Sequence, residues 1–377
     1  MKVMNIIYLV SDLRPAGPTN QAYNLVTGLL KMKCKPILVT LFEEQNDSWI
    51  ERFREANIQI VQLHTNRKRL KDAARKLDVI IEKYGIQIVH SSGLSADTVN
   101  RYLKTSVYKI NTIRQEFNQI AEDSNCFKRY IAKFITKLNY HAMNKRFACS
   151  KILSTQVQKS TGYAIDVVQN GVDIERFIPI TKDEKNKLRK KLSLPTDKII
   201  YISTGVFYKR KQMIELVDSF ISLNRSDIVL LLVGDGQTFD IIKDKVKDIR
   251  NKNIYLTGKV SNPLIYYQSS DVFISASTAE GLPNTVMEAM ACGLPCILSD
   301  IGPHKEILEF NSNAGLLFHT KNYDDLKNCI VKSFNWDLNE KSNESLSLVT
   351  KHLSKYSMAA NYYEVYRNLI NNQFSVI

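Results

Sequence analysis

Two glutamates stand on either side of a Gly-Leu-Pro turn in the stretch STAEGLPNTVMEAMACGLP, which runs from Ser277 to Pro295. Seven residues separate Glu280 from Glu288, and the pattern after the turn predicts a helix capped by Asn284 or Thr285. A helix N-terminus carries unpaired N–H groups and a partial positive charge, which suit a phosphate, while carboxylates accept hydrogen bonds from ribose and sugar hydroxyls. For one glutamate alone a solvated surface helix would be the better interpretation. The whole stretch favours a site for a ligand that carries phosphates and hydroxyls.

Further candidate side chains follow other predicted strands. His90 ends the strand IQIVH, Arg114 follows VYKINTI, and Gly17 and Thr19 lie in the loop after the first strand. In open α/β sheets ligands bind at the carboxyl ends of the strands, so these residues are candidates for a cleft. Each also has a structural interpretation, because a lone histidine is more often structural and Ala-Gly-Pro also occurs as an ordinary turn. No Asp-x-Asp motif occurs and the six histidines form no metal-spaced cluster, so no metal ligands are predicted.

The composition is that of an ordinary globular protein, with 44% hydrophobic and 24% charged residues. At about 150 residues per domain, the 377 residues predict two or three domains. The apolar runs are of strand length, far short of the roughly 20 residues that cross a bilayer, and the opening MKVMNIIYLV is interpreted as a buried strand rather than a signal peptide. Six scattered cysteines are expected to be free thiols. We therefore expect a cytoplasmic protein.

The net charge of +14 is concentrated in the first half of the chain. Residues 1–172 contain 26 Lys and Arg against 14 Asp and Glu, a net +12, which leaves 26 against 24 for the remainder. An anionic partner is therefore expected at the first half, whether nucleic acid, acidic lipid or a phosphate-bearing substrate. The segment Cys126–Arg146 is predicted to be a helix with one apolar face and basic residues elsewhere. Two interpretations stay open: it lies on an anionic membrane, or it packs on the sheet with a solvated basic rim.

Short apolar runs of strand type alternate with segments of helical periodicity along the whole chain. This alternation predicts an α/β protein with doubly wound parallel sheets. A polar stretch with two prolines, residues 173–197, is predicted to be a linker or surface helix between a lobe of residues 1–172 and a lobe of residues 198–355. The tail, residues 356–377, has apolar and aromatic residues at helical spacing and is predicted to be a helix that could cross back to the first lobe.

The stretch EGLPNTVMEAMACGLPCILSD resembles the signature of the retaining glycosyltransferases of family 4. Similar motifs follow in the family's order: VVQNGVDIERF at the lobe junction, then STGVFYKRKQMIELVDSF, LLVGDG, YYQSSDVFISAS and NAGLLF. In the first lobe only GPTNQAYNL and IVHSSG are similar. The resemblance implies the GT-B fold, two Rossmann-like lobes that face each other across a cleft. It also implies a metal-independent hexosyltransferase with no cofactor besides its donor substrate.

The resemblance also implies roles for individual residues. Lys211, with Arg210 beside it, would neutralise the departing diphosphate, Glu280 would contact the donor sugar, and Glu288 would bind the ribose. The other residues expected at the donor are Gly17, Val260, Gly281, Leu282, Pro283, Asn284 and Thr285. Those expected at the acceptor are Thr19, His90, Ser92 and Arg114. Two positions depart from the family, because Val206 stands where an arginine is common and Ser92 where some relatives have a histidine.

The expected activity is retaining transfer of a hexose or N-acetylhexosamine from a nucleoside diphosphate sugar, with a UDP-sugar favoured. The expected acceptor is a sugar hydroxyl of a lipid-linked bacterial surface polysaccharide, O-antigen or capsule, reached by peripheral contact of the basic lobe with the cytoplasmic face of the inner membrane. In the family the leaving phosphate is thought to help deprotonate the acceptor, so no protein nucleophile is named.

Three alternatives remain. The order of the motifs argues against a GT-B phosphorylase or a nucleotide-sugar epimerase. The presence of Lys211, Glu280 and Glu288 argues against a catalytically silent carbohydrate-binding or partner subunit. A nucleic-acid partner is not expected, because the basic half lacks aromatic-interleaved basic motifs of the recognised kinds.

Overall fold

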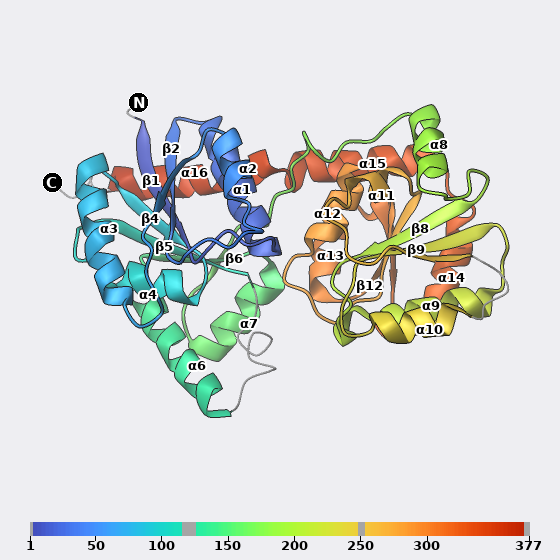
Figure 1. The fold of residues 1–377 in the computed structure, drawn as a ribbon, viewed down its shortest axis with the longest axis horizontal. Coiled ribbons are helices and arrows are strands. Elements are labelled where there is room, and N and C mark those ends of the chain that lie inside the picture. The colour runs from blue at the N-terminus through green and yellow to red at the C-terminus, as the bar shows by residue number, and fades with distance from the viewer. Residues whose placement is uncertain (1–2, 115–125, 248–252, 373–377) are drawn as a thin grey trace. The chain divides into compact units, whose positions relative to one another are not determined.

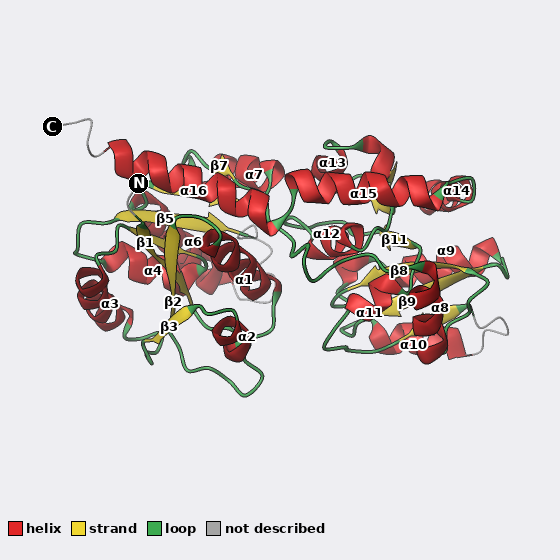
Figure 2. Cartoon of the chain, turned by 90° about the horizontal axis from the view of Figure 1, so that it is seen from above, coloured by secondary structure: helices red, strands yellow, loops and turns green. Residues whose placement is uncertain are grey.

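The computed structural model describes residues 3–114, 126–247 and 253–372, and it divides into two compact units (Figure 1). Unit 1 comprises the chain up to Gly171 together with the segment from Lys355 onward, and unit 2 comprises Val172–Ser354. Each unit contains one parallel sheet with helices packed on it (Figure 2). The α/β class with two doubly wound sheets, predicted from the alternation of strands and helices, is confirmed.

Unit 1 has a seven-stranded parallel sheet in the order β3-β2-β1-β4-β5-β6-β7. Its strands are β1 (Met4–Val10), β2 (Cys34–Thr40), β3 (Gln59–Gln62), β4 (Ile88–Ser91), β5 (Tyr108–Ile113), β6 (Lys145–Ala148) and β7 (Asp166–Val167). Its helices are α1 (Gly17–Leu30), α2 (Ile50–Glu55), α3 (Leu70–Tyr84), α4 (Leu94–Tyr102), α6 (Cys126–His141), α7 (Lys151–Thr161) and α16 (Lys355–Asn372).

Unit 2 has a six-stranded parallel sheet in the order β10-β9-β8-β11-β12-β13. Its strands are β8 (Ile199–Thr204), β9 (Ile228–Val233), β10 (Ile254–Leu256), β11 (Val272–Ser275), β12 (Cys296–Ser299) and β13 (Gly315–Phe318). Its helices are α8 (Lys182–Lys191), α9 (Met213–Leu223), α10 (Phe239–Lys247), α11 (Leu264–Gln268), α12 (Asn284–Ala291), α13 (Gly302–Leu308), α14 (Tyr323–Ser333) and α15 (Leu338–His352), with short 3₁₀ turns at Lys209–Lys211 and Ser312–Ala314.

Strand β1 shows why its sequence is continuously apolar. Ile6 and Tyr8 belong to the cluster that α1 and α16 cover, whereas Ile7 and Leu9 belong to the cluster that α3 and α4 cover. All four side chains are fully buried. A parallel sheet with helices on both faces buries both sides of its strands, so the usual alternation of apolar and polar residues is lost.

Helix α16 belongs to unit 1 although it comes last in the sequence. Met358, Ala359, Tyr362 and Tyr366 are buried in the same cluster as β1 and α1. The predicted tail, residues 356–377, corresponds to a helix that starts one residue earlier, at Lys355, and packs on the first unit as far as Ile370. Residues 373–377 of the predicted tail lie outside the described residues.

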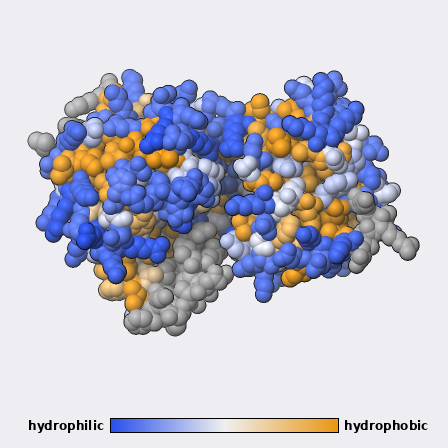
Figure 3. Space-filling model, viewed as in Figure 1, coloured by the Kyte–Doolittle hydropathy of each residue, from blue (hydrophilic) through white to orange (hydrophobic). Residues whose placement is uncertain are grey.

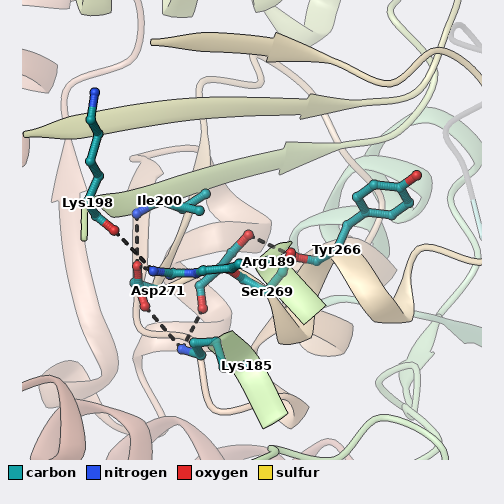
Figure 4. Close-up of polar contacts among 8 residues, drawn as sticks. Lys185, Arg189, Lys198, Ile200, Tyr266, Ser269 and Asp271 are labelled. Atoms are coloured by element: carbon teal, nitrogen blue, oxygen red, sulfur yellow. Dashed lines mark hydrogen bonds and ion pairs between the residues drawn. The ribbon is translucent and has the colours of Figure 1, made fainter. Parts of the chain in front are cut away.

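The polar stretch 173–197 is not a linker, because its helix α8 is bonded to unit 2 (Figure 4). The Arg189 side chain is only 4% exposed and donates to the carbonyl oxygens of Ser269 and Lys198. It also pairs with the Asp271 carboxylate at 2.5 Å, and Lys185 pairs with the other oxygen of that carboxylate at 3.1 Å. A buried arginine needs such partners for each N–H group, and this set anchors α8 beside β8 and β11.

Two further findings concern the chain as a whole. Among the described residues, no helix is both long and apolar enough to cross a membrane. The five cysteines whose side chains are described are buried thiols without a disulfide partner: Cys34, Cys149, Cys292, Cys296 and Cys329.

Candidate functional site

The loops after β8 and β11 meet at the carboxyl edge of the unit 2 sheet. The chain runs from β8 outward through β9 to β10 and then returns to β11 on the other side of β8. Loops on neighbouring strands with diverging connections leave a crevice at the strand ends, which is where open α/β sheets bind ligands. The two loops are joined directly, because the Thr278 amide donates to the Arg210 carbonyl oxygen at 2.8 Å.

Lys211, Glu280 and Arg210 form one ionic cluster at this edge. The Lys211 Nζ lies 2.5 Å from Glu280 Oε1, and Arg210 Nη1 donates a hydrogen bond to Glu280 Oε2 at 3.0 Å. The same Arg210 nitrogen donates to the Ala279 carbonyl oxygen at 2.8 Å. Two residues from one loop therefore hold a carboxylate from the other, and the cluster carries one net positive charge.

Two members of the cluster are nearly buried, which bears on the ionisation of the carboxylate. The Glu280 side chain is 9% exposed and that of Lys211 is 11% exposed. Burial alone would raise the pKa of Glu280, but the charges of Lys211 and Arg210 outweigh it and lower this pKa to about 2. Glu280 is therefore an anion at neutral pH and accepts hydrogen bonds rather than donating a proton.

Two glycines let the loops after β8 and β9 touch. Gly205 and Gly234 have φ angles of 134° and 137°, which residues other than glycine rarely adopt. A Cβ on Gly234 would lie 1.9 Å from the Gly205 carbonyl oxygen, and one on Gly205 would lie 3.7 Å from the Lys211 Nζ. The glycines thus allow the backbone to run close beneath the Lys211 ammonium.

Helix α12 begins at Asn284, and Pro283 is its N-cap residue without a side-chain cap bond. The prediction that the side chain of Asn284 or Thr285 caps this helix was therefore wrong, because proline fixes the entry of the chain instead. Of the other donor candidates in this turn, Leu282 is buried and Gly281 is half-buried. The turn leads directly from Glu280 into the first turn of α12.

Glu288 lies inside α12 and is 8% exposed. The hydroxyl of Tyr267, on α11, donates to Glu288 Oε2 at 3.2 Å and lies 2.7 Å from the Thr204 hydroxyl at the end of β8. This relay ties Glu288 to the strand whose loop carries Lys211. Tyr267 is a residue that the sequence did not reveal, because only the fold brings its hydroxyl to the carboxylate.

His304, in the first turn of α13 shortly after β12, also lies near this cluster and was not predicted. Its ring is fully buried, and Nδ1 lies 2.9 Å from the Ser299 carbonyl oxygen. Because a carbonyl only accepts, Nδ1 carries the proton and Nε2 is the bare nitrogen; Nε2 has no hydrogen-bond partner among the described residues. Burial lowers the His304 pKa to about 4, with Glu280 and Lys211 both close enough to act on it. Nothing local in the sequence marks this residue, because its position depends on how α13 packs behind β12.

In unit 1 the strands at the corresponding reversal of the chain are β1 and β4. Their carboxyl ends border two cavities of about 450 and 180 Å³ that share Pro18, Ser92 and Gly93 in their linings. Thr19 lines the larger cavity and Arg114 lines the smaller one. The structure therefore places three of the four predicted acceptor residues in the lining of these two cavities, together termed the hollow.

The fourth, His90, does not reach that hollow. Its ring is fully buried, with Nδ1 2.6 Å from the Tyr366 hydroxyl and Nε2 2.7 Å from the Thr112 hydroxyl. Burial, with a smaller effect of the Arg114 charge, lowers the His90 pKa to about 3. The prediction that His90 contacts the acceptor was wrong, because both ring nitrogens face protein hydroxyls and the ring joins α16 to the sheet.

The neighbouring Asp97 lines the smaller cavity and was missed. Its carboxylate accepts hydrogen bonds from the Ser91 hydroxyl at 2.7 Å and from the Asn111 amide at 3.1 Å. Burial raises the Asp97 pKa to about 6. No signal in the sequence distinguishes this aspartate, because its burial depends on packing between α4 and the sheet.

The two remaining donor candidates lie outside the ionic cluster, one at the start of a helix and one on a loop. Gly17 is the first residue of α1 and is exposed. Val260 lies half-buried in the loop after β10, two residues beyond Gly258, whose carbonyl oxygen accepts from the Gly234 amide at 3.0 Å. Val260 thus lies at the same sheet edge as Lys211. It follows β10, which is separated by β9 from the strand β8 that precedes Lys211.

Residues 184–345 match the family model of the glycosyl transferases group 1. The chain is also 29% identical over 210 residues to the UDP-Gal:alpha-D-GlcNAc-diphosphoundecaprenol alpha-1,3-galactosyltransferase of Escherichia coli. That match covers 54% of this chain and 52% of the relative, so this chain spans about half the relative's length. The O-antigen biosynthesis glycosyltransferase WclY of Escherichia coli is 24% identical over 375 residues, covering 97% of this chain and 99% of the relative.

Among solved structures, HepE of Anabaena in complex with UDP superimposes with a TM-score of 0.80 at 15% sequence identity. The superposition covers 97% of this chain and 100% of that chain. Similarity at this identity concerns the fold, and the fold is that of the GT-B glycosyltransferases. The predicted GT-B fold class, with one Rossmann-like parallel sheet in each of the two units, is therefore confirmed.

Proposed function

Because this chain belongs to the glycosyltransferases of the GT-B fold, we propose that it transfers a hexose or N-acetylhexosamine from a UDP-sugar to a sugar hydroxyl. The observation that carries this proposal is the Lys211–Glu280–Arg210 cluster at the reversal point of the unit 2 sheet, inside the segment that matches the glycosyl transferases group 1. Uridine as the base is supported by similar proteins, one named for UDP-Gal and one solved with UDP.

Within this proposal, each member of the cluster has a separate task. The cations Lys211 and Arg210 lie where the diphosphate would leave, and they would stabilise the negative charge that grows on it in the transition state. Glu280, anionic because of those same cations, would accept hydrogen bonds from donor hydroxyls. Glu288 would accept from the ribose hydroxyls, with Tyr267 holding its orientation.

We further propose that the reaction retains the anomeric configuration and proceeds without a metal ion. The positive charge that a divalent cation would bring to the diphosphate is supplied in this proposal by Lys211 and Arg210. The leaving phosphate would assist proton removal from the acceptor hydroxyl, so the proposal names no protein nucleophile. Activity that disappears in a chelator and returns with Mg²⁺ would contradict the metal-free part.

The acceptor proposed here is a lipid-linked oligosaccharide of a bacterial surface polysaccharide, O-antigen or capsule. The names of the similar proteins support this class, because one acts on a diphosphoundecaprenol-linked sugar and another serves O-antigen biosynthesis. In unit 1 the hollow with Ser92, Thr19 and Arg114 would receive the acceptor sugar. Such an acceptor would place the protein at the cytoplasmic face of the membrane.

A thermal-shift screen tests the donor part of the proposal. UDP, GDP, ADP, dTDP and CMP, followed by their sugar conjugates, are added to wild-type protein and to the Glu288→Ala variant. We expect one nucleotide, UDP, to raise the melting temperature of the wild type and to lose that effect in the variant. If no nucleotide raises the melting temperature of a folded wild-type protein, the result would instead favour the alternative, a catalytically silent GT-B subunit.

A further inference from the structure

Helix α6 turns an apolar stripe toward solvent instead of toward the protein. Tyr130 is 74% exposed, Ile131 is 41% exposed, Phe134 is 58% exposed and Leu138 is 38% exposed. At about 100° per residue these four side chains fall within an arc of about 100° on one side of the helix. Apolar atoms gather on this part of the surface, at the lower left of Figure 3 beside the grey atoms.

The opposite side of α6 is the side that packs. Asn139 and Tyr140 are buried, and the Asn139 amide donates to the Thr98 hydroxyl on α4 at 3.0 Å. An ordinary surface helix buries its apolar residues, whereas α6 buries Tyr140 but leaves the four apolar residues of the stripe exposed. The interpretation of this segment as an ordinary packed helix with a solvated rim therefore does not account for the exposed aromatic and aliphatic side chains.

The charged residues of α6 itself have one sign. Residues 126–141 contain four Lys and Arg and no Asp or Glu. Lys133 and Lys137 are exposed, and each directly precedes a residue of the stripe, Phe134 and Leu138 respectively, along one flank of it. Lysines beside exposed aromatic residues suit the interface of an anionic bilayer. There the apolar side chains can enter the acyl region while the lysines contact the negatively charged headgroups.

We propose that the α6 stripe, Tyr130, Ile131, Phe134 and Leu138, inserts into the interface of a membrane that contains anionic lipid, with Lys133 and Lys137 at the headgroups. A second copy of this chain is a poorer occupant, because its own α6 would bring the same lysines against these and repel them. This surface is separate from the proposed donor site, which lies in unit 2. It would bring the enzyme to the lipid-linked acceptor that the proposed function requires.

Vesicle co-sedimentation of the full chain tests this surface. The probes are vesicles of phosphatidylglycerol and phosphatidylcholine at 3:7, and vesicles of phosphatidylcholine alone, each at low and high salt. We expect the wild type to bind the anionic vesicles, to bind the neutral ones more weakly, and to lose much of the difference in high salt. Phe134→Glu should reduce binding to anionic vesicles at least tenfold, and Lys133→Glu with Lys137→Glu should reduce it by about tenfold or more.

A matched control makes the result specific to the stripe. Val79, on α3 of the same unit, is 65% exposed and lies outside α6, so Val79→Glu adds the same charge to another exposed apolar position and should leave binding unchanged. Equal loss in the Val79→Glu and Phe134→Glu variants, no binding by the wild type, or a wild-type dimer that Phe134→Glu dissociates would each overturn the proposal. The UDP thermal shift of Phe134→Glu should match the wild type. A missing shift in both proteins would count against the proposed donor and leave the vesicle result standing.

Discussion

In the proposed reaction the Lys211 ammonium interacts with two anions, the Glu280 carboxylate and the donor diphosphate. Substitution of Lys211 therefore tests the proposed mechanism most directly. Without donor it pairs with Glu280 at 2.5 Å, and with donor it would also face the diphosphate. Because the need for its charge is greatest as the leaving group departs, Lys211→Ala should lower turnover by about 100-fold or more and donor affinity by much less. Steady-state kinetics combined with calorimetric binding of the donor would separate the two effects.

Lys209 offers the control for that experiment, because it is an exposed lysine two residues away whose charge is not among those that lower the pKa of Glu280. Lys209→Ala should keep normal turnover. If Lys211→Ala also turns over normally, Lys211 has no part in the chemistry and the cluster serves only to hold the two loops together.

Glu288 tests recognition rather than chemistry. Its carboxylate is nearly buried and receives the Tyr267 hydroxyl, so it is oriented before any ligand arrives. Loss of its bonds to the ribose in Glu288→Ala should weaken UDP binding by about tenfold or more, since each hydrogen bond to a charged group contributes about 1.5–3 kcal/mol. Isothermal titration with UDP measures this, with the exposed Glu340 as the site of a control alanine variant. Equal affinity in the wild type and Glu288→Ala would remove the ribose role.

The candidate residues that the sequence revealed share one property, which is that their motif is local. Glu280, Glu288 and Lys211 could be predicted because each lies in a short stretch with a characteristic spacing. Tyr267 and Asp97 were missed because their importance depends on burial and on partners from other elements. His90 was wrongly placed for the same reason, since its partner Tyr366 is 276 residues away in the sequence.

At the scale of elements, the contact between α1 and α16 depends on the absence of one side chain. A Cβ on Gly28 would lie 2.7 Å from the Ala359 Cβ and 2.8 Å from the Lys355 carbonyl oxygen. Helix propensity alone predicts that Gly28→Ala stabilises α1 by about 1 kcal/mol. The clash predicts the opposite sign, a lower melting temperature, because neither a Cβ nor a backbone carbonyl can move aside cheaply. Thermal unfolding decides between them, and adding Ala359→Gly should recover part of the loss.

Helix α8 shows what limits prediction at this scale. Its lysine-rich sequence and flanking prolines are typical of a linker or a surface helix, and nothing local marks Arg189 as buried. The residue that makes its burial favourable, Asp271, is 82 residues away and contacts Arg189 only because β11 pairs with β8. Strands and helices could therefore be predicted from their own periodicity, whereas the assignment of α8 to unit 2 required the pairing of distant strands.

At the scale of the whole molecule, the buried titratable groups of both units act together on stability. His90 in unit 1 and His304 in unit 2 have pKa values lowered by burial to about 3 and about 4, and both would return to about 6.5 on unfolding. Between about pH 6.5 and pH 4 the unfolded chain therefore binds more protons at these two sites, so each contributes stability that is lost as the pH falls. Asp97 acts in the opposite direction below pH 6, because its raised pKa makes the folded chain bind the extra proton.

Between about pH 6.5 and pH 4 the two histidines lower the free energy of unfolding as the pH falls, and Asp97 offsets one of them. The net result is a loss of about 1.4 kcal/mol per pH unit on acidification. Glu280 adds little there, because its pKa is lowered to about 2 and its contribution disappears only below the ordinary glutamate range. We expect the melting temperature to be highest above pH 6.5 and to fall steadily toward pH 5. His304→Gln should flatten this fall, since a neutral amide has no proton to gain, whereas Asp97→Asn should make it steeper. A flat wild-type profile, or one that steepens in His304→Gln, would mean that these groups are not buried in the folded protein in solution.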